Sequence, residues 1–234
     1  LKDEPQSFGT NHVFSLTESE MTLTFTGIEK PPVPSLLRGF SAPVSLQFDY
    51  DTEALAHLMA HDSDPFNRWE AGQRLALNVL LAGINSHSQG RDVIFPEVFV
   101  DACARVLADS GDDPAFAAEA LVLPSAVYIA EQLNEVDPEA IFVVRTGLRR
   151  HLATCLKTGL ENAYGELVTT GDYSPDPESA GRRSLRNLCL SYLMELDTHE
   201  VRSWALDQVN NANNMTDAMA ALGTLANNDC RERR

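Results

Sequence analysis

The feature that most constrains the fold is a series of apolar stripes with helical spacing, which begins near residue 51. Within each stripe the apolar residues recur at i, i+3, i+4 and i+7, so they share one face of an α-helix. Each such helix has a broad face to bury, which favours helices packed against one another. The clearest stripes are Leu77, Leu80, Leu81 and Ile84; Val98, Phe99, Ala102, Cys103, Val106 and Leu107; and Leu185, Leu188, Cys189, Tyr192, Leu193 and Leu196.

The predicted helices also have recognisable first residues. An Asp side chain can accept hydrogen bonds from the free N–H groups of a first turn, and proline at the first helical position wastes no donor. We expect roughly eight helices, joined by short polar connections that make neighbours antiparallel. The fold class predicted is mainly α, with helical hairpins stacked as an α-superhelix, although no sequence period repeats. The Asp-Pro starts are Asp64-Pro65, Asp113-Pro114, Asp137-Pro138 and Asp176-Pro177.

Residues 1–48 have a different pattern, with the period of two that is typical of β-strands. Met21, Leu23 and Phe25 alternate with threonines, and a similar alternation covers residues 44–48. Three or four strands are too few to close a sandwich with two buried faces. We therefore expect a partial β-sandwich over 1–48 and the N-terminal part of a helical domain over 49–234, with more chain expected at both ends.

The charge of the chain excludes some classes of partner. Lys and Arg number 18 against 34 Asp and Glu, a formal net charge of -16. Nucleic-acid binding begins from clustered cationic side chains, and anionic membrane surfaces repel acidic proteins. No apolar run approaches the roughly 18 residues that span a bilayer. We expect no nucleic-acid or membrane partner, and a cytoplasmic location in which the negative charge maintains solubility.

Two residue pairs resemble catalytic arrangements. His57 and His61 lie one turn apart and could hold zinc, but Leu58 occupies the position of a general base and no third ligand is evident. Surface histidines are the favoured interpretation and zinc binding the alternative. His151 and Cys155 have the same spacing; core packing of Cys155 is favoured over a Cys–His nucleophile. We predict no catalytic and no metal-binding residue.

Two polar clusters, at 64–73 and 210–217, are the candidate functional sites. The first cluster has two equally supported interpretations. Its Trp and Arg form an interface with another surface, or the Trp packs locally while the Arg bridges to an acid. In the second cluster, helix capping is favoured over a polar contact to another domain. The candidate interdomain or structural residues are Arg38, Asn67, Arg68, Trp69, Gln73, Asn213, Asn214 and Asp217.

Four stretches carry a resemblance to a known family: residues 32–44, 66–73, 186–190 and 212–222. In order and spacing they resemble the bacterial-type aminopeptidase N family, the zinc-dependent alanyl aminopeptidases of the gluzincin class, over about residues 20 to 230. That family has a β-domain, a thermolysin-like catalytic domain, a small β-sandwich and a large helical domain. The resemblance implies that residues 1–48 are the last strands of the sandwich and that the first part of the helical domain follows.

The resemblance also implies a division of labour within a larger parent protein. The family's HExxH zinc site and GAMEN-type motif are absent from this sequence. The parent would use zinc to remove N-terminal residues from peptides, whereas this portion would hold no cofactor, be inactive alone, and supply chamber wall and interdomain docking. Its partners would be the rest of the chain and, in the parent, peptides. A freestanding helical-repeat adaptor is the alternative; a small hydrolase is the weakest hypothesis.

Overall fold

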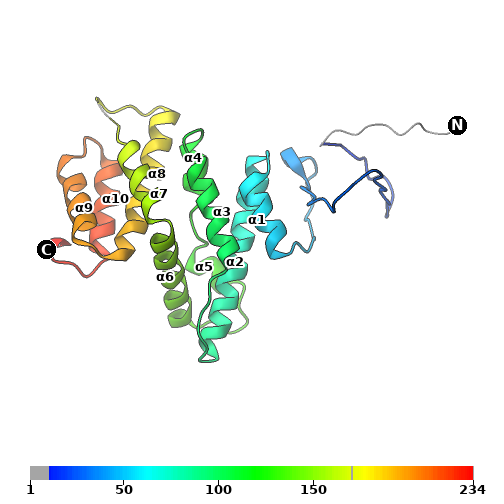
Figure 1. Cartoon of the computed structure of the whole chain (residues 1–234), viewed down its shortest axis with the longest axis horizontal. Helices are drawn as coiled ribbons and strands as arrows, with labels where there is room; N and C mark the ends of the chain where they lie inside the picture. Colours follow the sequence, from blue (N-terminus) through cyan, green and yellow to red (C-terminus); the bar gives the residue numbers. More distant parts are fainter. Residues whose placement is uncertain (1–10, 170, 234) are drawn as a thin grey trace. The chain divides into compact units, whose positions relative to one another are not determined.

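The computed structural model describes residues 11–169 and 171–233, and contacts divide the chain into two units, 1–32 and 33–234. All ten α-helices of the described residues lie in the second unit (Figure 1). They confirm the predicted mainly helical fold class. The helices are α1 (Thr52–His61), α2 (Pro65–Ser88), α3 (Glu97–Ala108), α4 (Pro114–Ala120), α5 (Ala126–Ala130), α6 (Pro138–Cys155), α7 (Lys157–Glu166), α8 (Pro177–Leu193), α9 (His199–Asn211) and α10 (Met215–Ala226).

All four predicted Asp-Pro helix starts are confirmed. Asp64, Asp113, Asp137 and Asp176 each accept a hydrogen bond from a backbone N–H of the first turn, and the following proline begins the helix. Each cap satisfies a donor that has no partner within the helix. These local signals therefore define where α2, α4, α6 and α8 begin.

Successive helices pack as hairpins, and the hairpins stack on one another. Helix α1 packs on α2, α7 on α8 and α9 on α10, while α2 contacts α6 and α4 contacts α8 (Figure 1). One apolar core runs through the stack, and its members include Leu75, Phe99, Leu148 and Leu193, all almost fully buried. Burying such a side chain stabilises the fold by about 1.5–3 kcal/mol.

Close helix packing depends on a glycine. A Cβ placed on Gly83 of α2 would lie 2.7 Å from Val144 Cγ1 of α6 and 3.1 Å from Val93 Cγ1. Because these contacts are shorter than van der Waals distances, only a glycine lets the two helices approach this closely.

The expected number of helices, roughly eight, was too low. Helix α5 has only five residues, capped by Ser125, and a stripe this short has no detectable period. Helices α6 and α7 are separated by one residue, Leu156, which serves as C-cap of the first and N-cap of the second. Such a break leaves the apolar pattern almost uninterrupted.

The strands expected in residues 1–48 do not form in the described part of that range. Residues 11–48 contain no strand. Between described residues, their one backbone–backbone hydrogen bond outside helices runs from Val44 N to Ala42 O. The alternating side chains Met21, Leu23 and Phe25 are exposed. A strand is stable only when another strand pairs with it, and this stretch has no such partner in the described residues. Residues 1–10 of the expected sandwich lie outside the described range.

Among residues 11–169 and 171–233, no helix combines the length and the apolar composition that a bilayer span requires.

Candidate functional site

The first polar cluster joins an irregular segment to the α1–α2 hairpin; we call Ser35, Arg38, Asp62, Asp64 and Asn67 the α1–α2 cluster. Asp62 follows α1, and its side chain is 1% exposed. Its carboxylate accepts a hydrogen bond from the guanidinium of Arg38, which also donates to Ser35 Oγ at 2.9 Å. Burial acts to raise the pKa of Asp62, but hydrogen bonds and the Arg38 charge outweigh it, so this pKa lies below its ordinary value.

Asn67 fastens the same segment from the first turn of α2. Its Nδ2 donates to Ser35 Oγ at 2.8 Å and to the carbonyl of Leu36 at 2.9 Å. The carboxylate of Asp64 accepts from Asn67 N, as the cap of α2, and from Gly39 N at 2.9 Å. The start of α2 therefore holds residues 35–39, a segment about 30 residues earlier in the chain.

These contacts hold a backbone that would otherwise be unfavourable. Leu37 and Phe40 have φ of 54°, in the left-handed region that non-glycine residues rarely occupy, and Gly39 lies between them with φ of 60°. Such conformations cost on the order of 1–3 kcal/mol each for non-glycine residues. The turn places Phe40, 70% exposed, against Phe66 with ring centroids 4.4 Å apart.

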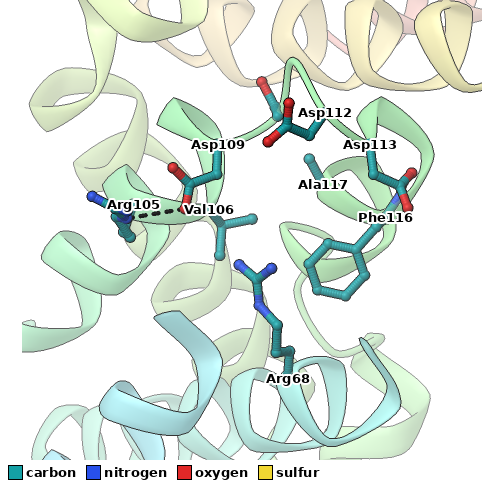
Figure 2. A pocket seen from close by; sticks show the side chains of 9 residues that line it. Arg68, Arg105, Val106, Asp109, Asp112, Asp113, Phe116 and Ala117 are labelled. Atoms are coloured by element: carbon teal, nitrogen blue, oxygen red, sulfur yellow. Dashed lines mark hydrogen bonds and ion pairs between the residues drawn. The ribbon is translucent and has the colours of Figure 1, made fainter. Parts of the chain in front are cut away.

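Arg68 lies over the ring of Phe116, with its guanidinium carbon 4.6 Å from the centroid, and its Nε donates to the carbonyl of Met59 at 3.1 Å. Figure 2 shows this guanidinium in a pocket of about 300 Å³ between α2, α3 and α4, beneath Asp109 and Asp112. The structure records no ion pair between Arg68 and a carboxylate of the described residues. Asp109, the C-cap of α3, instead pairs with Arg105 of that helix at 3.0 Å. Arg68 thus joins helices through an aromatic ring and a carbonyl.

The remaining residues of the first cluster have separate contacts. Trp69 is half-buried, with its ring 5.8 Å from that of Phe66. Gln73 donates from Nε2 to the carbonyl of Val122 at 2.8 Å, which links α2 to the segment after α4.

The second polar cluster lies where α8, α9 and α10 meet. Asn214 caps α10 by accepting from Asp217 N at 2.9 Å, and Asn213 donates to the carbonyl of Gly171 at 3.0 Å. The side chain of Asp217 accepts from Asn187 Nδ2 at 2.8 Å and from Asn214 Nδ2 at 2.9 Å. Asp217 is buried. Its two oxygens are therefore satisfied by neutral amides.

Sequence reasoning missed the residue at the centre of this cluster, Gln208. Its Nε2 donates to Asn187 Oδ1 at 2.7 Å and to the carbonyl of Asp217 at 3.0 Å. Its Oε1 accepts from Arg186 Nη1 at 2.7 Å and from Tyr164 Oη at 3.1 Å. Burial raises the pKa of Tyr164, and the charge of Arg186 opposes that rise. We call Gln208, Tyr164, Arg186, Asn187 and Asp217 the amide cluster.

A signal for Gln208 was present in the sequence. It follows Val201 and Ala205 at i+7 and i+3, on the buried face of α9. A polar residue in a buried stripe needs hydrogen-bonding partners, and could have been singled out for that reason.

The histidine pair has no third metal ligand beside it among the described residues. His57 and His61 are exposed, with ring centroids 5.1 Å apart. Nowhere in residues 11–169 and 171–233 do three or more His, Cys, Asp or Glu side chains gather as metal ligands would. A protein zinc site needs three or four ligands.

The expectation that Cys155 packs in the core was wrong, because this thiol is exposed. Its Sγ lies 3.7 Å from His151 Nε2. Helix α6 ends at Cys155, so no further turn of that helix covers it.

Comparison with known proteins identifies relatives over most of the chain. Residues 52–234 match the family model "Domain of unknown function (DUF3458_C) ARM repeats", and residues 1–49 match "Domain of unknown function (DUF3458) Ig-like fold". Aminopeptidase N of Escherichia coli K12 is 40% identical over 91% of this chain, and that of Caulobacter vibrioides is 38% identical over 88%. Each alignment covers 24% of the relative.

A solved structure shows the same relation. The crystal structure of Legionella pneumophila aminopeptidase A in complex with aspartic acid matches with a TM-score of 0.74 and 30% identity. The match covers 89% of this chain and 25% of that one. The chain thus spans about a quarter of the length of these relatives, and its resemblance to aminopeptidase N is confirmed.

Proposed function

The chain belongs to the DUF3458_C family of ARM-repeat domains, and on this premise we propose that it is a non-catalytic part of a zinc metallo-aminopeptidase. The observation that carries the proposal is the alignment with aminopeptidase N at 35–40% identity, over about 90% of this chain and about a quarter of each relative. The parent would remove N-terminal residues from peptides. Its zinc would be held by residues outside this chain, whose own histidine pair does not fit the metal.

We propose a helical domain from about residue 49. Before it we propose the end of a β-sandwich domain, which the Ig-like family match to residues 1–49 supports and whose strands would pair with the rest of that domain in the parent. In the parent, this portion supplies chamber wall and interdomain docking. Arg38, Asn67, Gln73, Asn214 and Asp217 would act structurally, because their polar groups already have partners within the chain.

The docking surface itself would be aromatic. The tilted rings of Phe40, 70% exposed, and Phe66, 41% exposed, contact each other beside half-buried Trp69. Exposed apolar patches of this kind are typical of interaction sites. The proposed location is the cytoplasm, with peptides as the parent's substrates and neither nucleic acid nor membrane as partners.

The acidic composition suggests a further property of the wall. A net charge of -16 favours the positively charged amino terminus of a peptide over anions. If the wall acts in this way, kcat/KM of the parent falls as ionic strength rises, and neutralising wall carboxylates removes that dependence.

The test of the proposal compares the chain alone with the chain added to a catalytic region. The purified chain with added zinc is assayed on alanine p-nitroanilide, and then mixed with E. coli aminopeptidase N from which the matched stretch has been removed. We expect no turnover by the chain alone and a gain of activity in the mixture. Zinc-dependent turnover by the chain alone would contradict a non-catalytic role.

A further inference from the structure

A groove of about 930 Å³ lies between α5, α6, α8 and α10, and we call it the α6–α10 groove. Its volume is within the range of protein sites that hold small ligands. Large apolar side chains on its walls are exposed: Val127 at 69%, Phe142 at 68% and Met219 at 53%. Exposed apolar surface of this kind is typical of sites that bind a ligand or another protein.

The groove also contains an arginine without a counter-charge. Arg145 and Arg149 lie one turn apart on α6, and both line the groove. Glu195 is the one acid among the described lining residues, and it pairs with Arg149 at 2.6 Å. Arg145 has no ion pair in the described residues, so the groove carries one uncompensated positive charge in a strongly acidic chain.

The hydrogen bonds of Arg145 leave part of its guanidinium available. Nε donates to the carbonyl of Pro124 at 2.8 Å, and Nη2 lies 3.5 Å from the carbonyl of Leu123. Nη1 donates to no acceptor among the described residues. Burial lowers the pKa of Arg145, and the charge of Arg149 lowers it further. A ligand carboxylate beside the guanidinium would oppose both effects, as the charge of Glu195 already does in part.

We propose that the α6–α10 groove binds a short apolar peptide through its C-terminal carboxylate, which pairs with Arg145. The apolar side chains of the peptide would contact Val127, Phe142 and Met219. The charge of the groove favours an anionic end, and its walls favour apolar residues, which leaves the main-chain carboxylate as the anion. The inference rests on the proposed function, which supplies peptides as ligands, and adds a residue that selects their C-terminus.

A purely structural role for Arg145 makes a different prediction. If this side chain only braces the carbonyls of Leu123 and Pro124, the groove will not distinguish a carboxylate from an uncharged amide. Binding of two probes that differ only at this group therefore separates the two roles.

The experiment measures fluorescence anisotropy of the full 234-residue chain with fluorescein-labelled Leu-Phe-Leu, as free acid and as C-terminal amide. We expect the acid to bind at least tenfold tighter, a difference of about 1.4 kcal/mol. Arg145→Gln should abolish the preference, and Arg145→Lys should retain part of it. Arg150→Gln, at an exposed position of the same helix outside the groove lining, is the matched control and should behave as the unsubstituted chain.

Equal affinity of the unsubstituted chain for acid and amide overturns the inference, as does absence of binding by either probe. Persistence of the acid preference in folded Arg145→Gln also overturns it. The comparison of probes on the unsubstituted chain stands even if a variant fails to fold. If the unsubstituted chain shows no acid preference but activity is gained in the peptidase mixture, this inference alone is refuted. If the preference is present but no activity is gained, the proposed function alone is refuted.

Discussion

The two polar clusters bury a carboxylate in different ways. In the α1–α2 cluster, Asp62 is balanced by the charge of Arg38; where α8 and α10 meet, Asp217 is satisfied by the amides of Asn187 and Asn214. The first cluster fastens an irregular segment with left-handed residues to a helix start, while the second joins regular helices. The strained segment is thus held by a charge pair, whereas the carboxylate buried between packed helices is satisfied by neutral amides.

The largest effect should come from removing the counter-charge of Asp62. Arg38→Ala leaves a buried carboxylate without its partner, which costs about 3 kcal/mol of unfolding free energy. Urea unfolding followed by circular dichroism measures it. Arg38→Ala combined with Asp62→Ala should cost less than Arg38→Ala alone, because no unpaired charge remains. An equal or greater loss in the double variant would show that an unpaired charge on Asp62 is not what destabilises Arg38→Ala.

A substitution in the amide cluster should lower the unfolding free energy somewhat less than Arg38→Ala does. Gln208→Ala leaves Tyr164 Oη, Arg186 and Asn187 without their shared partner, at a cost of about 2 kcal/mol. The same urea titration measures it. Arg182→Ala, at a neighbouring position of α8 outside the cluster, is the control and should cost well under 1 kcal/mol. A Gln208→Ala loss as small as the control's would show that the cluster contributes little.

Loss of a helix cap should also differ between the two clusters, with a smaller loss of unfolding free energy than the substitutions above. Asn214→Ala removes the cap of α10 and should cost about 1 kcal/mol, whereas Asn214→Ser should restore most of it. Asp64→Ala should cost more than Asn214→Ala, because Asp64 caps α2 and also holds Gly39 N. Thermal unfolding of the three variants tests this order. Equal costs would mean that the bond to Gly39 adds nothing.

The smallest effect should appear in how the unfolding free energy depends on pH. The pKa of Asp62 is lowered in the folded state, so its contribution is present above the unfolded pKa, near 3.8, and is lost as pH falls through the folded value. Unfolding free energy measured from pH 6 down to pH 3 should decline more steeply for the unsubstituted chain than for Asp62→Asn. Parallel curves for the two proteins would contradict a lowered pKa.

Helix positions were predictable because their signals are local. An Asp-Pro pair indicates where a helix begins, and the i, i+3, i+4 pattern indicates which face it buries. The starts of α2, α4, α6 and α8 could therefore be predicted from residues close together in the chain. The partners of Arg38 and Gln208 were not predictable in this way, since Asp62 and Tyr164 lie 24 and 44 residues away. The alternation at Met21, Leu23 and Phe25 indicated strand pattern but could not supply a pairing partner.

The proposed function is tested most directly by grafting. In E. coli aminopeptidase N, the matched stretch is replaced by this chain, and kcat/KM for alanine p-nitroanilide is compared with that of the protein lacking the stretch. Our account predicts that the graft exceeds the deleted protein by roughly tenfold or more, equivalent to about 1.4 kcal/mol of transition-state stabilisation. A folded, zinc-containing graft no more active than the deleted protein would contradict it.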